Sequence, residues 1–238
     1  MAANEIAKEA LLVEGVDNEK ISIIPQSVDT RVFRPKIKSD EGKLVSLRKR
    51  IGIRSDDFVV LGVGRMVWEK GWLDIIRAAA KLRQSKEIKF LLVGAGPELS
   101  AFSNFVKRER LRKSVLFAGS MPYRLMPDVY RLADVFVHAS LPTRDWNEQF
   151  GGVLIEAMAT GLPVIGTLSG GILTTVGSEG GLFVQLQNFS QISEAINTLY
   201  RNDRLRRKMG HRNIKHAVNI YDVEVVAQKL KRIWDNLL

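Results

Sequence analysis

Five short apolar runs, rich in β-branched residues, recur through the middle of the chain and alternate with segments of helical spacing. The runs are FVVLGVG (58–64), KFLLVGAG (89–96), VLFAG (115–119), DVFVHAS (134–140) and LPVIGT (162–167). Runs that are apolar nearly throughout are typical of strands buried on both faces of a parallel sheet. Strands alternating with helices at this rhythm predict an α/β fold with a doubly wound, Rossmann-like parallel sheet.

Both ends of the chain add elements outside this pattern. They are a short amphipathic helix (1–15), a strand (20–25), a charged segment with a helical patch (38–56) and three C-terminal helices (188–202, 204–218 and 222–238). Asn188 is expected to cap the first of these three helices, with Gln191 as its capping-box partner. The sheet core is therefore expected over about 57–185, with helical additions on both sides.

The net charge of +10 favours anionic partners. The cations concentrate in 106–113 and 200–216, where interspersed acids are typical of solvated helix faces. No aromatic residues interleave them, so we expect no nucleic-acid partner, while a weak contact with an anionic membrane stays open. The absence of cysteine excludes disulfides and thiolate chemistry. Without a long apolar run or a signal peptide, we expect a cytoplasmic protein, with a peripheral position at the inner face of the membrane left open.

Two loops that follow the first two apolar runs are candidate sites, because open parallel sheets bind ligands at the carboxyl ends of their strands. GVGRMVWEKGW places Arg65 and Lys70 beside Gly64 and a helix start, a combination suited to a diphosphate. Two solvent-facing cations are the alternative. VGAGPEL contains Gly94 and Gly96, which permit close backbone approach. Without a third glycine this dinucleotide signal is weak, and a tight strand-to-helix turn is the alternative.

A third loop contains two glutamates, Glu148 and Glu156, on either side of Gly151 and Gly152. GGVLIEAMA predicts a helix that begins near Gly151, with free N–H groups and its positive dipole end at the ligand edge. Glu148 precedes this helix and can point into the cleft. A buried carboxylate needs hydrogen-bond donors, and sugar hydroxyls are suitable ones. The alternative is that Glu156 pairs with a nearby Arg or Lys and that Glu148 is a surface residue.

In this order, the segments closely resemble the C-terminal half of retaining GT-B glycosyltransferases of the group 1 or glycogen-synthase-like family. The segments are GVGRMVWEKG, LLVGAGPEL, VLFAGSM, LADVFVHAS, EQFGGVLIEAMATGLPVI and SGG. Glu148 and Glu156 match the family's E-x7-E motif. The resemblance implies that Arg65 and Lys70 neutralise the donor diphosphate. It also implies that Glu148 contacts hydroxyls of the donor sugar and that Glu156 contacts the ribose of the nucleotide.

The resemblance also implies the rest of the donor site and the nature of the donor. The backbone at 150–152 would lie against phosphate and sugar, and 119–121 would border the base. We expect a UDP-, GDP- or ADP-sugar, with no tightly bound cofactor and no metal, since no D-x-D pair suggests one. For His138, an approach to the cleft and a structural role both stay open. The predicted site comprises Glu148, Arg65 and Lys70 acting on the donor, and Gly64, Gly94, Gly96, Gly119, Met121, Phe150, Gly151, Gly152 and Glu156 binding it.

The chain departs from the family pattern in two loops, and the resemblance covers only the second of the family's two Rossmann-like domains. Gln26 and Ser27 stand where members usually have an asparagine–glycine pair. GGILTTV lacks the usual proline–glutamate after the second Gly-Gly. We expect an inter-domain-type segment over 1–37, a Rossmann-like nucleotide-sugar-binding domain over 38–220 and a crossing helix over 221–238.

Two functions stay open at this point. The first is the donor-binding half of an enzyme that transfers a hexosyl unit, with retention of configuration, in polysaccharide or glycolipid biosynthesis. The second is a non-catalytic or split nucleotide-sugar-binding module that needs a separate acceptor-domain polypeptide.

Overall fold

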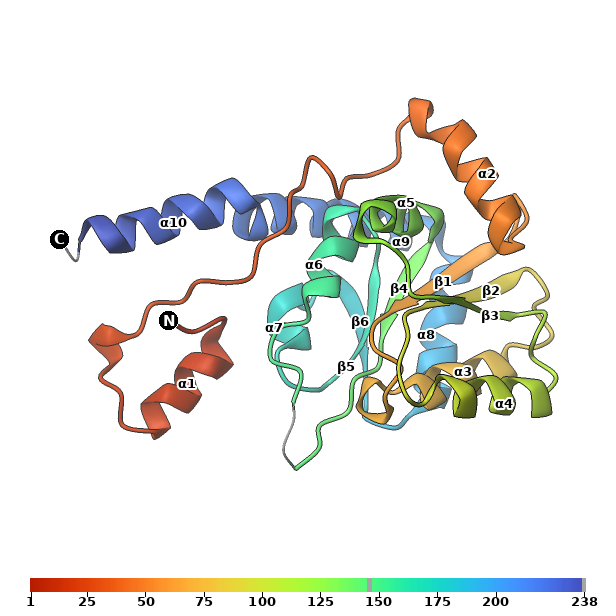
Figure 1. The fold of residues 1–238 in the computed structure, drawn as a ribbon, viewed down its shortest axis with the longest axis horizontal. Helices are drawn as coiled ribbons and strands as arrows, with labels where there is room; N and C mark the ends of the chain where they lie inside the picture. Colours follow the sequence, from red (N-terminus) through yellow and green to blue (C-terminus); the bar gives the residue numbers. More distant parts are fainter. Residues whose placement is uncertain (145–146, 237–238) are drawn as a thin grey trace.

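The computed structural model describes residues 1–144 and 147–236, with a six-stranded parallel sheet at the centre (Figure 1). The strands are β1 (Phe58–Val63), β2 (Ile88–Val93), β3 (Val115–Gly119), β4 (Val135–His138), β5 (Val164–Thr167) and β6 (Gly181–Val184). They lie in the order β3-β2-β1-β4-β5-β6, so the direction of winding reverses between β1 and β4. This is the doubly wound α/β arrangement that the apolar runs predicted, and the prediction of fold class is confirmed.

Helices cover both faces of the sheet, and two more, α1 and α10, lie away from it. The helices are α1 (Glu5–Val13), α2 (Glu41–Ile51), α3 (Trp72–Lys81), α4 (Leu99–Arg108), α5 (Met126–Leu132), α6 (Gly152–Ala159), α7 (Ile172–Val176), α8 (Phe189–Arg201), α9 (Asp203–His216) and α10 (Val223–Asp235). Side chains alternate between the two faces of a strand. In β1, Val60 packs in the core with α3, α4 and α8, while Val59 and Leu61 pack in the core with α2, α5, α6 and α7.

Two predicted details outside the sheet are wrong. Residues 20–25 form no strand, because their pairing is limited to a single bridge between Ala2 and Ile23. Asn188 does cap α8, accepting a hydrogen bond from the Gln191 backbone N–H at 3.0 Å. The Gln191 side chain does not complete a capping box, since its Oε1 accepts from the Gln185 backbone N–H at 2.8 Å.

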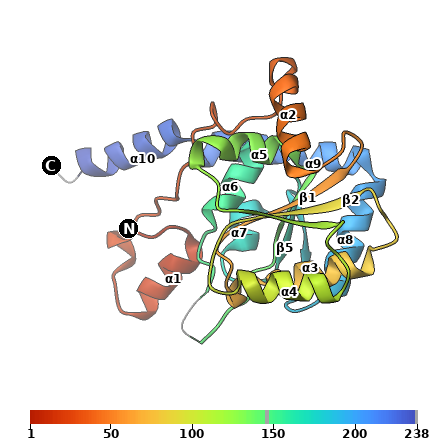
Figure 2. The same ribbon diagram turned by 45° about the vertical axis from the view of Figure 1, so that its right-hand side comes forward.

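The N-terminal and C-terminal segments of the chain meet beside the sheet. Val28 forms a parallel bridge with Asp222, whose carboxylate also accepts a hydrogen bond from the Thr30 hydroxyl at 2.5 Å. From this point α10 extends away from the sheet, as Figures 1 and 2 show. The helix predicted over 222–238 is observed over Val223–Asp235, and residues 237–238 lie outside the described part.

Within residues 1–144 and 147–236, none of the helices combines the length and the apolar character that crossing a bilayer would require.

Candidate functional site

A pocket of about 320 Å³ opens at the carboxyl edge of the sheet, where the loops after β1, β2 and β3 meet α6. Five of its lining residues are positions that the sequence predicted: Gly64, Arg65, Gly94, Met121 and Glu156. These residues come from four separate segments of the chain. The strand ends therefore bring a cation, a carboxylate and exposed backbone to one small cavity.

Close backbone packing explains the glycines beside this pocket. A Cβ atom at Gly94 would stand 1.8 Å from the Gly64 carbonyl oxygen, and one at Gly96 would stand 2.4 Å from the Met66 carbonyl oxygen. Gly96 thus lets the second loop lie directly on the first. Gly119 differs, since a Cβ there would meet nothing within 4 Å, but its φ of +68° favours glycine.

Glu156 lies on the pocket side of α6 and contacts tyrosines. The Tyr130 hydroxyl donates to its Oε2 at 2.6 Å, and Tyr123 also donates a hydrogen bond to its carboxylate. Burial raises the pKa of Glu156, and the two tyrosine hydrogen bonds oppose that rise. The alternative of an Arg or Lys partner for Glu156 does not match these contacts.

Glu148 lies at the centre of a buried polar cluster at the same edge of the sheet. Its Oε2 accepts from Lys70 Nζ at 2.6 Å and from the Ser140 hydroxyl at 3.1 Å, and lies 2.8 Å from His138 Nε2. Glu148 is only 7% exposed, so the interpretation of a surface residue is wrong. Burial by itself raises the pKa of Glu148, but contacts with His138 and Lys70 outweigh it and hold the pKa at about 2.

The first turn of α6 separates the Glu148 cluster from the pocket. Gly151 caps the helix with a φ of +75°, and a Cβ atom there would lie 3.7 Å from Glu148 Cδ. The start of α6 at a double glycine matches the prediction. Gln26, one of the two departures from the family pattern, reaches this point, since its Oε1 is 2.9 Å from where a Gly152 Cβ would stand. The Phe150 ring points into the core and meets the Tyr221 ring edge to face, with centroids 5.4 Å apart.

Residues 169–171 pack against the backbone of the loop that contains Glu148. The Gly171 backbone N–H donates to the Glu148 carbonyl oxygen at 2.7 Å. A Cβ at Gly170 would stand 2.0 Å from that same oxygen. The Asn4 side-chain amide donates to the Gln149 carbonyl oxygen, so the N-terminal segment also helps to hold the loop.

Sequence reasoning missed Tyr123, Tyr130 and Ser140 and left His138 undecided. A signal for two of them was available, because alternate positions of a strand share a face. His138 ends β4 and Ser140 lies two positions further, so both point toward Glu148. The tyrosines carried no such signal, since α5 reaches Glu156 only through the tertiary fold.

The depressed pKa of Glu148 predicts an acid-dependent stability. The pKa of the Glu148 carboxyl group is about 2 in the folded protein, against an ordinary value of 4.5. The stability that this difference provides is fully present above pH 4.5 and is lost as the pH falls toward 2. We expect about 2–3 kcal/mol to disappear over this window. Urea unfolding across the window measures it, with Glu148→Gln as the reference. Parallel pH profiles for parent and variant would contradict the assignment.

No group of three or more His, Cys, Asp or Glu side chains that could hold a metal ion occurs within the described ranges.

Comparisons with known proteins agree on one family. The family model for glycosyl transferases group 1 matches residues 46–216. A curated relative, the phosphatidylinositol N-acetylglucosaminyltransferase GPI3 subunit of Saccharomyces cerevisiae, is 27% identical over 242 residues, covering 100% of this chain and 50% of that protein. The chain spans about half the length of the curated relatives that it matches.

Two solved structures share the fold. HepE from Anabaena, in complex with UDP, has a TM-score of 0.87 at 22% identity, covering 99% of this chain and 63% of HepE. The C-terminal domain of LpcC, a group 1 family glycosyl transferase from Francisella tularensis, has a TM-score of 0.69 at 25% identity. That match covers 83% of this chain and 100% of the LpcC domain.

Proposed function

This chain belongs to the group 1 glycosyl transferase family, and we propose that it forms the nucleotide-sugar-binding half of a retaining glycosyltransferase. The observation that carries the proposal is the pocket at the carboxyl edge of the sheet. In it, Arg65, exposed backbone and Glu156 converge next to the start of α6. HepE, which shares the fold, binds UDP, and this supports a nucleotide-linked donor.

The diphosphate of the donor would bind between Arg65 and the start of α6. Arg65 is exposed at the pocket, and the free N–H groups of the first α6 turn add positive potential there. Lys70 contributes as well, because its ammonium group lies beside Glu148 at the same edge of the sheet and adds positive charge there. These positive groups would stabilise the nucleoside diphosphate as the glycosidic bond breaks, which is the main role of the protein in such a transfer.

The two glutamates would bind hydroxyls on either side of the diphosphate. For Glu156 we assign the ribose, since a carboxylate accepts about four hydrogen bonds in all and can add ribose hydroxyls to its two tyrosine donors. For Glu148 we assign the donor sugar. The three contacts described above reach its Oε2, so the sugar hydroxyl would bind through Oε1.

The second candidate is a module that works with a separate acceptor-domain polypeptide. One fact favours it: the yeast relative is named as a subunit. In this arrangement, residues 1–37 and 221–238 would be the segments that face the acceptor domain. Donor hydrolysis or transfer by this chain supports the first candidate, and donor binding without turnover supports the second. The anomeric configuration of the product, read by NMR, tests retention.

Titration calorimetry with UDP-, GDP- and ADP-sugars tests the donor assignment. We expect saturable binding of at least one donor by this chain, because the pocket offers both a diphosphate site and a ribose acceptor. If the folded protein shows no heat of binding with any donor at millimolar concentration, the donor site is wrong.

Replacing Glu156 with alanine tests the ribose contact separately. Hydrogen bonds to a charged group contribute about 1.5–3 kcal/mol, so Glu156→Ala should weaken binding of the preferred nucleoside diphosphate roughly tenfold or more. The 2′,3′-dideoxy analogue of this nucleotide lacks the two ribose hydroxyls, so it should bind the parent and the variant with equal affinity. Glu194→Ala, on the exposed side of α8, is the matched control. An equal loss for both ligands would place Glu156 outside the ribose site.

A further inference from the structure

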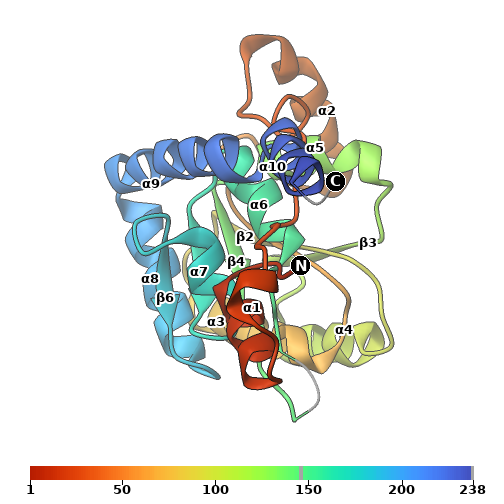
Figure 3. The ribbon, with the colours of Figure 1, turned by 90° about the vertical axis from the view of Figure 1, so that its left-hand side faces the viewer.

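Helix α2 projects from the body of the protein, as Figures 1 and 3 show. It leads into the amino end of β1, whereas the donor pocket lies at the carboxyl ends of the strands. A cavity of about 660 Å³, here termed the α2 cavity, lies between this helix and residues 36–38. Leu44 and Ile53, which are buried, contribute to its lining. No part of the donor site contributes to its lining, so the α2 cavity is a separate feature of the protein.

The lining of the α2 cavity is strongly basic. It contains one acidic side chain, Glu41, and five basic ones: Lys36, Lys38, Arg48, Lys49 and Arg131. The three lysines are exposed. Arg48 donates mainly to backbone carbonyl oxygens, including that of Leu132 at 2.9 Å, and these neutral acceptors leave its charge in place. The cavity therefore favours a negatively charged occupant.

Two apolar side chains stand in solvent among these cations. Ile37 is 53% exposed on one wall of the cavity, and Val45 is 64% exposed on the other. A single exposed aliphatic side chain is ordinary. Here two exposed aliphatic side chains line one basic cavity, which is the pattern of a surface that binds acidic head groups and inserts apolar side chains between them.

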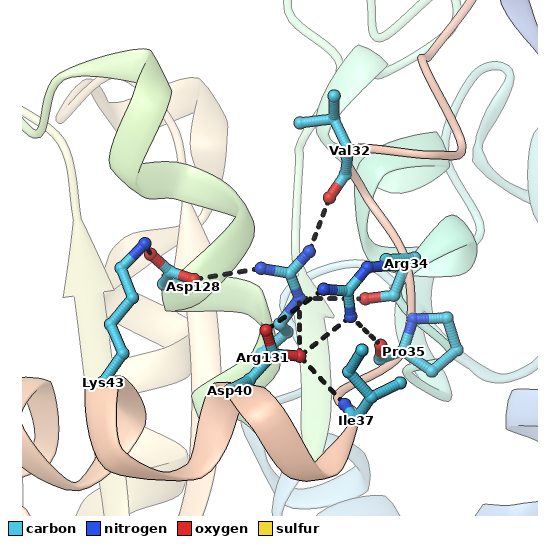
Figure 4. Close-up of polar contacts among 8 residues, drawn as sticks. All are labelled: Val32, Arg34, Pro35, Ile37, Asp40, Lys43, Asp128 and Arg131. Carbon is cyan, nitrogen blue, oxygen red and sulfur yellow. Dashed lines mark hydrogen bonds and ion pairs between the residues drawn. The ribbon is translucent and has the colours of Figure 1, made fainter.

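A polar network holds the two walls in place (Figure 4). Arg131, buried on α5, donates to the Val32 carbonyl oxygen at 2.7 Å and to Asp128 at 2.9 Å. Asp128 also pairs with Lys43 of α2. Next to residues 36–38, the Arg34 guanidinium donates two hydrogen bonds to the Asp40 carboxylate, at 2.8 and 3.1 Å. The cavity is thus preformed, so an occupant does not have to order its walls.

We propose that the α2 cavity and its rim dock onto the surface of an anionic lipid bilayer. Lys36, Lys38 and Lys49 contact lipid phosphates, and Ile37 and Val45 insert at the level of the head groups. Because the donor pocket lies at the opposite edge of the sheet, it stays open to solvent in the docked protein. Docking does not depend on nucleotide binding, so the proposal stands apart from the donor assignment.

Co-sedimentation with vesicles tests the proposal, using phosphatidylcholine alone or mixed with phosphatidylglycerol. We expect binding to the mixed vesicles that falls as salt is added, and little binding to phosphatidylcholine alone. Each basic residue near an acidic surface contributes about fivefold in partitioning, so the pair Lys36→Gln and Lys38→Gln should weaken binding roughly thirtyfold. The pair Ile37→Ser and Val45→Ser should weaken it at least about tenfold, through loss of apolar insertion.

The matched control removes two cations from the opposite face of the sheet, where α4 packs. Lys107→Gln with Arg112→Gln changes the net charge by the same amount at exposed positions around the end of α4. Circular dichroism confirms that all variants fold. An equal loss of vesicle binding in the control would assign the effect to net charge and overturn the proposal. Equal binding to both kinds of vesicle would also overturn the proposal. So would substitutions at Lys36 and Lys38 that abolish calorimetric binding of inorganic phosphate but leave vesicle binding unchanged.

Discussion

Replacing Lys70 with methionine is expected to weaken nucleoside diphosphate binding about a hundredfold and to lower the free energy of unfolding by about 2–3 kcal/mol. The first effect follows from the loss of a charge-assisted contact with the diphosphate. The second follows because Lys70 Nζ lies 2.6 Å from Glu148, which is 7% exposed and would stay buried without its cation. Calorimetric titration measures the first effect, and urea unfolding measures the second.

A second substitution separates these two effects. Adding Glu148→Gln to Lys70→Met removes the buried charge, so most of the lost stability should return while nucleotide binding stays weak. Lys86→Met, at an exposed position before β2, is the control for removal of a lysine. If the double variant regains nucleotide binding along with stability, Lys70 acts on the fold alone and its assignment to the diphosphate is wrong.

Replacing Gly71 with alanine is expected to cost at least about 3 kcal/mol of folding free energy. A Cβ atom there would stand 1.9 Å from the Ala139 carbonyl oxygen and 2.7 Å from its carbon, and this backbone cannot move cheaply. Gly71 also has a φ of +67°, which an alanine adopts at a cost of about 1–2 kcal/mol. Thermal or urea unfolding measures the total.

Gly52 provides the matched control for Gly71. It has a similar φ of +82°, but a Cβ atom there would meet nothing within 4 Å. Gly52→Ala should therefore cost only the conformational term, about 1–2 kcal/mol. The difference between the two variants isolates the close approach of the Lys70 loop to the end of β4. Equal costs would mean that this approach is looser than the distance indicates.

The sheet could be predicted from sequence because its strands are buried on both faces. Each of the five runs is apolar nearly throughout, and each contains an observed strand or most of one. The same local signal fails at 20–25, where the residues are apolar enough for a strand but no neighbouring strand is present to pair with them. Pairing is a property of the tertiary fold, so local composition alone predicts it poorly.

The edge that carries the candidate site could also be predicted, but the contacts within it could not. The rule that ligands bind at carboxyl strand ends places Arg65 and Glu156 correctly at one pocket. Nothing local indicates that Lys70 reaches Glu148, 78 positions away, or that Tyr130 of α5 reaches Glu156. Those contacts depend on side-chain direction after the fold has formed.

The glycines show a different limit of sequence reasoning. A position where a ligand approaches the backbone and a position where another loop approaches it can both require glycine, because a Cβ atom would block either approach. Gly94 lines the pocket and also packs on the Gly64 backbone, whereas Gly96 packs on the Met66 backbone and does not line the pocket. The sequence GAG does not distinguish these two roles, so both glycines were predicted to bind the donor.

The contact between the N-terminal and C-terminal segments lies close to contacts that link α10 to the candidate site. Tyr221 lies just before α10. Its hydroxyl donates to the Thr175 carbonyl oxygen at 2.9 Å, and its ring contacts the Phe150 ring. Phe150 immediately precedes Gly151, the residue that caps α6. A continuous set of contacts, from Tyr221 through Phe150 to Gly151, therefore connects the start of α10 to the first turn of α6.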